Sequence, residues 1–84
     1  MSFFVYVLYS PKFDKIYVGF SSDWQKRLES HNSLATKGWT TRFRPWSLIH
    51  LEYYETKNLA IKREKQLKGA KGRQWIRNVI LKKK

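Results

Sequence analysis

Hydrophobic and aromatic positions crowd the first twenty residues of the chain and fall into two short runs. Residues 3–9 are apolar almost without interruption, which predicts a central strand covered on both faces. Residues 15–20 alternate, and this pattern predicts a second strand whose side chains Ile16, Val18 and Phe20 face the core. The two runs together predict a β-hairpin.

The segment between the runs sets how the strands pair. Pro11 and Asp14 are turn formers, which favours a loop of four or five residues. We expect a four-residue loop to place Tyr6 opposite Tyr17, with both phenols on one face, and a five-residue loop to shift the pairing by one. Gly19 leaves the face beside Tyr17 without a side chain, so another group can approach the backbone there. The two tyrosines beside this glycine form a candidate site.

A helical pattern follows the hairpin. Residues 23–32 predict a helix, and residues 21–23 offer a choice of N-caps. Arg27 and His31 are four positions apart on this helix, so their side chains are expected to lie side by side.

Residues 32–45 show neither the strand nor the helix period, and we expect a long loop there. Positive charges and aromatic rings alternate along it: Lys37, Trp39, Arg42, Phe43 and Arg44. This mixture suits phosphate contacts and base stacking.

Residues 46–54 alternate and predict a third strand. The alternation places three side chains on one face, Ile49, Leu51 and Tyr53, and three on the other, Leu48, His50 and Glu52. We interpret His50 as a structural histidine.

Two helices are predicted to follow, at residues 57–68 with Thr56 as the cap and at residues 72–81. The first is expected to bury Leu59, Ala60 and Leu67 and to end at Gly69; the second is expected to have one apolar side, formed by Trp75, Ile76, Val79 and Ile80. The order β-β-α-β-α-α predicts an α+β domain spanning residues 1–84, with a three-stranded antiparallel sheet flanked by helices.

Charge changes this picture more than composition does. The formal net charge is +12, and residues 57–84 hold eleven Lys or Arg against one acid, Glu64. Such an imbalance favours a polyanionic partner, although a solvated basic helix with a disordered lysine tail is the alternative interpretation. The absence of cysteine excludes disulfides and thiolate metal sites, and no run approaches the ~20 apolar residues of a membrane span. Without a secretory signal pattern, we expect a cytoplasmic protein that does not bind membranes.

Cleavage of a phosphodiester requires a cation on the phosphate, a proton acceptor for the attacking water and, commonly, a divalent metal. Arg27 offers a guanidinium fork, and Glu64 offers one carboxylate for Mg²⁺. Tyr6, Tyr17 and His31 can hydrogen-bond the water. Each has a structural alternative: the tyrosines as half-buried strand residues, Arg27 and His31 as a solvated helix face, and Glu64 as an ion-pair partner of Lys68.

These residues resemble the motifs of the GIY-YIG nuclease superfamily over nearly the whole chain. The matching segments are Phe4-Val5-Tyr6, then Tyr17-Val18-Gly19, the helix with Arg27 and His31, Pro45-Trp46, and residues 60–68 with Glu64. The chain is most similar to the small stand-alone, single-domain subgroup, and also to the N-terminal nuclease domain of the excision-repair incising subunit. Phe4 replaces the usual first glycine, and Asn78 is a candidate for the asparagine that many relatives have after the glutamate.

The resemblance implies a β-β-α-β-α core and a metal-dependent DNA endonuclease in repair or recombination. It implies that Tyr6 positions or deprotonates the attacking water and that Tyr17 orients this water or contacts the phosphate. It also implies that Arg27 stabilises the phosphate, His31 assists proton transfer and Glu64 binds Mg²⁺, with Mn²⁺ as the alternative ion. We expect DNA, or alternatively RNA, to contact a set of cations: Lys37, Arg42, Arg44, Lys62, Arg63, Lys65 and Lys68. A protein partner is a candidate for selecting the target. The alternative hypothesis is a non-catalytic DNA- or RNA-binding module on the same fold.

Overall fold

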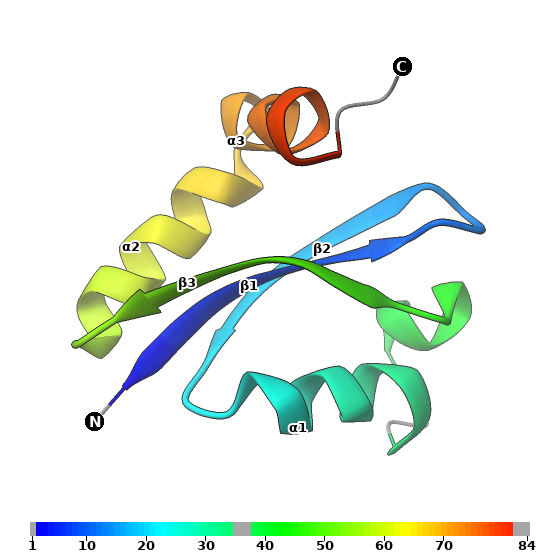
Figure 1. The fold of residues 1–84 in the computed structure, drawn as a ribbon, viewed down its shortest axis with the longest axis horizontal. Helices are drawn as coiled ribbons and strands as arrows, with labels where there is room; N and C mark the ends of the chain where they lie inside the picture. Colours follow the sequence, from blue (N-terminus) through cyan, green and yellow to red (C-terminus); the bar gives the residue numbers. More distant parts are fainter. Residues whose placement is uncertain (1, 35–37, 82–84) are drawn as a thin grey trace.

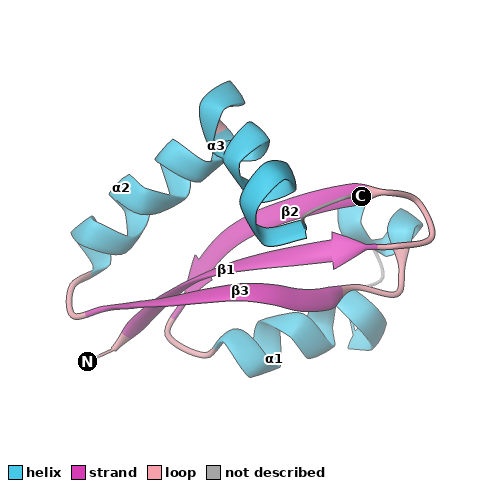
Figure 2. Ribbon diagram, turned by 45° about the horizontal axis from the view of Figure 1, so that its top comes forward, coloured by secondary structure: helices cyan, strands magenta, loops and turns pink. Residues whose placement is uncertain are grey.

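A computed structural model of the chain describes residues 2–34 and 38–81 and confirms the α+β architecture (Figure 1). The elements are β1 (Phe3–Ser10), β2 (Lys15–Ser21), α1 (Trp24–Glu29), β3 (Ser47–Tyr54), α2 (Lys57–Lys68) and α3 (Ala70–Trp75), with π-helical turns η1 (Ser30–Leu34) and η3 (Ile76–Leu81) and a 3₁₀ turn η2 (Trp39–Phe43). The antiparallel sheet has the order β2-β1-β3, so β1 is central as predicted (Figure 2). Among these described elements, no helix is both long and apolar enough to span a bilayer.

The hairpin register differs from the predicted one. A four-residue turn at residues 11–14 pairs Ser10 with Lys15, and this places Tyr6 opposite Gly19 rather than opposite Tyr17. The prediction was therefore wrong by two positions. Because side chains alternate with a period of two, the two phenols still share one face of the sheet.

Two hydrophobic clusters lie on opposite faces of the sheet. Under α2, α3 and η3 the buried residues are Val5, Val7, Val18, Ala60, Leu67 and Ile76, and Ile16 and Phe20 pack against them as predicted. On the α1 side the buried residues are Tyr6, Leu8 and Trp46, with Tyr17, Trp24, Leu28, Phe43 and Leu48 packed around them. Figure 1 shows α1 and α2 on opposite sides of the sheet. β2 is an edge strand, so its outer side borders both layers.

β3 contains an irregularity that the alternation did not predict. Val7 pairs with His50 and Leu8 pairs with Leu48, so Ile49 is an extra residue in the strand. The bulge sends Leu48 to the Tyr6 cluster and Ile49 to the α2 cluster, which reverses the predicted faces of both residues.

The helices begin and end close to their predicted positions. Thr56 caps α2 by accepting a hydrogen bond from the Leu59 amide at 3.3 Å, and α2 ends at Lys68, directly before Gly69. Two inward predictions were wrong, since Leu59 is 51% exposed and Val79 is 45% exposed. α2 buries two residues, Ala60 and Leu67, as predicted.

The last helix starts at Ala70, earlier than predicted, and crosses α2 closely: a Cβ on Gly72 would overlap the backbone of Gln66 and Leu67. The first helix extends past its predicted end, because η1 continues α1 to Leu34. Part of the predicted loop is also helical, since η2 occupies its second half.

Candidate active site

Tyr6 is the most deeply buried member of the predicted site, with 1% of its surface exposed. Its phenol lies across Gly19: a Cβ built on that glycine would be 2.5 Å from the Tyr6 hydroxyl oxygen. The group that approaches the bare backbone is therefore this tyrosine. Its ring lies 6.2 Å from the ring of Tyr17, with an interplanar angle of 35°. Glycine is required at this position because any side chain would displace the phenol.

His31 connects both tyrosines to the segment after η1. Its Nε2 is 3.4 Å from the Tyr6 hydroxyl, its Nδ1 is 3.0 Å from the Thr40 hydroxyl, and its ring is 4.6 Å from the ring of Tyr17. Thr40 is 7% exposed. The sequence analysis missed Thr40, because a threonine in an aperiodic segment carries no signal of its own. Thr40, His31 and Tyr6 form one hydrogen-bonded chain of side chains.

Hydrogen bonds to the backbone hold η1 in place. Asn32 donates to the Trp46 carbonyl at 2.9 Å and accepts from the Trp46 amide at 2.6 Å. Arg44 donates from Nε to the His31 carbonyl at 2.5 Å and from Nη2 to the Ser30 carbonyl at 3.4 Å. The Asn32 contacts tie η1 to Trp46, and the Arg44 contacts bind two carbonyls of η1, so together they fix the backbone that carries His31.

The environment sets the protonation state of the two central groups. Burial, together with the neighbouring Tyr17, raises the pKa of Tyr6 to about 12, although a hydrogen bond and the positive charge of Arg27 oppose the rise. Burial lowers the pKa of His31, and the positive charges of Arg27 and Arg44 lower it further. At neutral pH Tyr6 is therefore a neutral phenol and His31 a neutral imidazole.

Glu64 lies on α2, which covers the other face of the sheet. Its carboxylate is close enough to Tyr6 to contribute to the raised pKa of that phenol. The structure also contains the predicted alternative, because Lys68 Nζ lies 3.1 Å from Glu64 Oε2. The Glu64 side chain is 19% exposed, and that of Lys68 is 49% exposed. The carboxylate is thus both near the phenols and held by an exposed lysine that can move away.

The described residues include no group of three or more His, Cys, Asp or Glu side chains that could enclose a metal. A single carboxylate still fits a hard cation such as Mg²⁺, which typically takes one or two carboxylates and fills its other positions with water and phosphate oxygens. Glu64 is the residue of the site that matches this chemistry.

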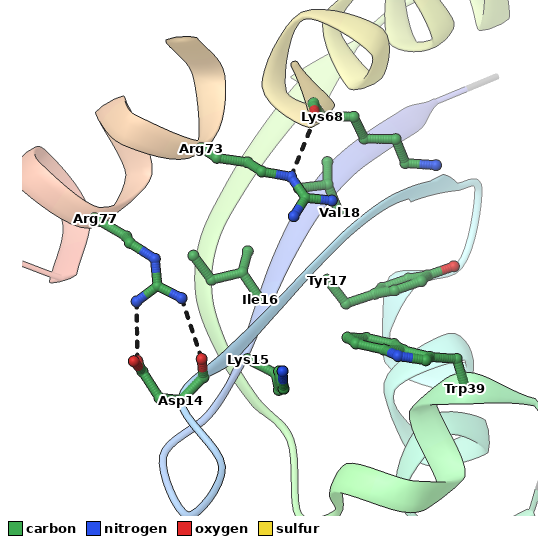
Figure 3. Close-up of a pocket in the computed structure, with 9 residues that line it drawn as sticks. All are labelled: Asp14, Lys15, Ile16, Tyr17, Val18, Trp39, Lys68, Arg73 and Arg77. Carbon is green, nitrogen blue, oxygen red and sulfur yellow. Dashed lines mark hydrogen bonds and ion pairs between the residues drawn. The ribbon is translucent and has the colours of Figure 1, made fainter. Parts of the chain in front are cut away.

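A groove of about 540 Å³ opens beside Tyr17 along the outer edge of β2 (Figure 3). We call it the β2 groove, and its lining residues are Asp14, Lys15, Ile16, Tyr17, Val18, Trp39, Lys68, Arg73 and Arg77. Figure 3 shows Tyr17 and Trp39 on one side and the three cations from the α2, α3 and η3 layer on the other. Two of these cations are held within the protein, because Arg77 pairs with Asp14 at 2.9 Å and Arg73 donates to the Lys68 carbonyl at 3.2 Å.

The predicted nucleic-acid contacts divide into three groups. Lys62, Lys65 and Arg42 are exposed, and Lys68 lines the β2 groove. Lys37 lies outside the described residues. Arg44 and Arg63 instead bond to the protein itself, so we leave both out of the proposed nucleic-acid surface. Asn78 is exposed on η3.

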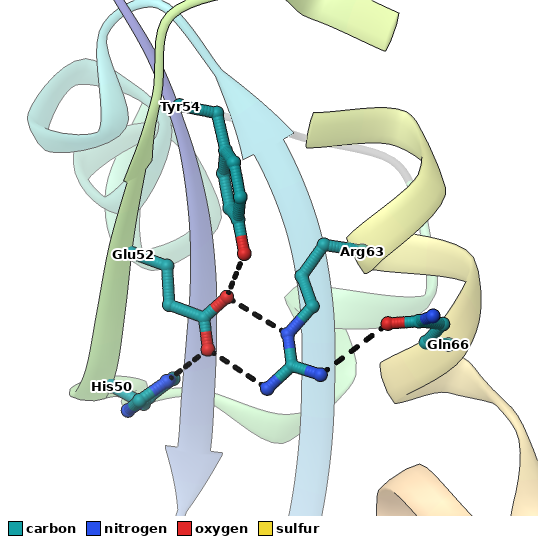
Figure 4. Close-up of polar contacts among 5 residues, drawn as sticks. All are labelled: His50, Glu52, Tyr54, Arg63 and Gln66. Carbon is teal, nitrogen blue, oxygen red and sulfur yellow. Dashed lines mark hydrogen bonds and ion pairs between the residues drawn. The ribbon is translucent and has the colours of Figure 1, made fainter. Parts of the chain in front are cut away.

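Arg63 belongs to a polar network that joins α2 to β3 (Figure 4). Its Nε and Nη2 donate to the two carboxylate oxygens of Glu52 at 2.8 and 3.0 Å. His50 and Tyr54 each contact the same carboxylate at 2.7 Å, which agrees with a structural role for His50. Burial works against the charged form of Glu52, but the hydrogen bonds from Arg63, His50 and Tyr54 outweigh it and lower its pKa to about 2.

Comparison with known proteins gives matches over most of the chain. Residues 2–78 match the model of the GIY-YIG catalytic domain, a nuclease family. A "UPF0213 protein" of Bacillus velezensis is 41% identical over 78 residues, covering 89% of this chain and 78% of that protein. A "UPF0213 protein" of Staphylococcus aureus is 37% identical over 67 residues, covering 80% of each chain. The solution structure of a UPF0213 protein from Bacillus halodurans superposes with a TM-score of 0.56 at 22% identity, covering 94% of this chain and 85% of that one, and it shares the fold.

Proposed function

Because this chain belongs to the GIY-YIG catalytic domain family, we propose that it is an endonuclease that hydrolyses phosphodiester bonds in DNA with the help of a divalent metal ion. The observation that carries the proposal is the convergence of one phenol with four charged or polar partners. Tyr6 contacts His31, lies beside Tyr17, and has a pKa that responds to both Arg27 and Glu64. These five groups come from elements on both faces of the sheet.

In this proposal Arg27 binds the scissile phosphate, since its exposed guanidinium carries a permanent charge and a planar fork for two oxygens. Tyr6, with its pKa raised to about 12, acts as a neutral phenol that orients the attacking water. His31 accepts the proton, because its neutral Nε2 faces the phenol. Thr40 holds the imidazole in position through Nδ1.

The residues fit one divalent ion, which Glu64 would hold once Lys68 moves aside. Such an ion, Mg²⁺ or alternatively Mn²⁺, would supply Lewis-acid stabilisation of the charge on the phosphate. In the structure, the carboxylate of Glu64 is paired with Lys68.

The proposal is tested by incubating supercoiled plasmid and branched DNA with the protein and Mg²⁺, with an EDTA control. We expect nicking that is lost in EDTA and in Glu64→Ala. The matched control is Glu55→Ala, which removes another acid from an exposed position outside the site. Equal nicking by Glu64→Ala and the wild type would reject the metal role of Glu64, and no nicking of any DNA form would reject the endonuclease.

The second candidate function is a DNA- or RNA-binding module without turnover. The observation in its favour is the Lys68–Glu64 pair, which occupies the only carboxylate that we assign to a metal. In that case affinity should fall steeply with salt and remain unchanged in Tyr6→Phe. We keep DNA repair or recombination as the hypothesis for the pathway, the cytoplasm as its location, and a protein partner as the means of target selection.

A further inference from the structure

Three aromatic rings continue from the candidate site toward the tip of the β1–β2 hairpin. Trp39 and Phe43 come from η2, and Phe13 comes from the hairpin turn. The Trp39 and Phe43 rings are 4.8 Å apart, and the Phe43 and Phe13 rings are 5.4 Å apart. We call these three residues the aromatic row. Trp39 is 46% exposed and Phe13 is 40% exposed, so much of the row is not used by the core.

The row starts at the candidate site. The Trp39 ring lies 5.8 Å from the ring of Trp46, which in turn lies 6.4 Å from the ring of Tyr17. Trp39 and Tyr17 also line the β2 groove together, as Figure 3 shows. A strand whose phosphate lies at Tyr17 therefore has the row within reach.

Positive charges follow the row on the hairpin side. Lys15 Nζ lies 5.4 Å from the centre of the Phe43 ring, and Lys12 Nζ lies 5.6 Å from the centre of the Phe13 ring. Both lysines are exposed, and so is Arg42 on η2. Ammonium groups this close to aromatic rings match a polymer that alternates flat bases with phosphates.

We propose that the aromatic row binds an unpaired segment of the DNA strand on one side of the cleavage site. Bases stack on aromatic side chains only when their faces are free, so a fully paired duplex would leave the row unused. The flanking lysines and the net charge of +12 favour this occupant over an apolar segment of a protein. This inference rests on the proposed function, and it adds the class of substrate, namely single-stranded or flapped DNA.

The test measures binding in EDTA, so that it does not depend on cleavage. The probes are a short single-stranded DNA, an abasic strand of the same length and the corresponding duplex. Trp39→Ala should weaken binding to the single strand by roughly five- to a hundredfold, while binding to the abasic strand should stay the same. Trp39→Phe should restore much of the affinity. Tyr53→Ala, which removes a 56% exposed aromatic ring from β3, is the matched control and should change neither affinity.

A second measurement follows binding to the wild-type protein, and a variant serves only to assign one signal. The indole N–H signal of Trp39, assigned by its loss in Trp39→Phe, should shift when the single strand is added and stay in place with the abasic strand. The Trp46 indole donates to the Thr40 carbonyl at 2.8 Å and is 3% exposed, so it serves as the internal reference.

The inference is overturned if base-bearing and abasic strands bind alike, if Trp39→Ala affects no probe, or if the duplex binds as tightly as the single strand. Specific binding of single strands without any nicking in Mg²⁺ would support the row and reject the nuclease. Nicking that does not depend on Trp39 would support the nuclease and reject the row.

Discussion

Replacing Glu52 by glutamine tests whether the polar network of β3 fixes the position of α2. The carboxylate of Glu52 accepts hydrogen bonds from Nε and Nη2 of Arg63. Arg63 directly precedes Glu64 on the helix. Successive side chains on a helix point about 100° apart. Because Arg63 is held against β3, Glu64 therefore points toward a different side of α2. The network therefore determines where the candidate metal ligand points.

The magnitude follows from the pKa of Glu52, which folding lowers from 4.5 to about 2. A fully shielded carboxyl with this change would contribute about 3 kcal/mol. Since the Glu52 and Arg63 side chains are 18% and 29% exposed, we reduce this to about 2 kcal/mol for screening by solvent. Because the folded pKa is the lower one, this contribution is fully present above the unfolded value and is lost as the pH falls toward about 2.

The assay is urea unfolding followed by tryptophan fluorescence at a series of pH values. At neutral pH, Glu52→Gln should lose about 2 kcal/mol, equivalent to a melting temperature lower by about 8–16 °C for a domain of this size. The difference from the wild type should shrink as the pH falls below the unfolded pKa. Glu55→Gln, at an exposed acid directly after the end of β3, is the control and should change stability by less than about 0.5 kcal/mol. A loss that does not depend on pH, or an equal loss in both variants, would refute the reasoning.

Four further predictions concern the candidate site. Tyr6→Phe should lower the plasmid nicking rate by about a hundredfold or more with little change in melting temperature; an unchanged rate would remove the phenol from the mechanism. Gly19→Ala should abolish nicking and destabilise the fold by roughly 1–3 kcal/mol in urea, because its Cβ would overlap the Tyr6 hydroxyl. The rate should be level across neutral and mildly alkaline pH and fall only in acid, since the pKa of His31 is lowered and that of Tyr6 is raised to about 12; a half-maximal point above the ordinary histidine value would contradict this. Lys68→Met should lower the Mg²⁺ concentration for half-maximal nicking by about twofold, because Mg²⁺ would no longer compete with an exposed ion pair to Glu64. A higher Mg²⁺ concentration for half-maximal nicking would count against that pairing.

Local signals in the sequence were sufficient for most of the fold. The turn formers and the two apolar runs predicted the hairpin, and Thr56 and Gly69 marked the ends of α2 at the positions observed. The bulge at Ile49 was not predictable, because it depends on how β3 pairs with β1. Leu59 was wrongly placed in the core, because the buried face of α2 is narrow: it contains Ala60 and Leu67 and does not extend to Leu59.

The candidate site divides in a similar way. Tyr6, Tyr17 and Gly19 could be found together because hairpin neighbours are fixed by sequence spacing, even though the register was wrong by two. Thr40, the ion pair of Arg63 and the backbone hydrogen bonds of Arg44 could not be found. Each depends on contacts between elements that are distant in sequence. The sequence alone does not distinguish an exposed arginine from one that bonds within the protein.

The position of the site at the edge of the sheet explains how so short a chain can assemble it. The phenols lie on the α1 face and Glu64 lies on the α2 face, so a site in the middle of the sheet would be divided by the backbone of β1. At β2 there is no further strand, and Gly19 lets Tyr6 extend across that strand toward its open side. Groups from both layers then line a single groove, with Tyr17 and Lys68 on its two walls. The outer edge of β2 thus has to stay open for the site to exist, and the exposed cation of the strand, Lys15, protects this edge against pairing with another sheet.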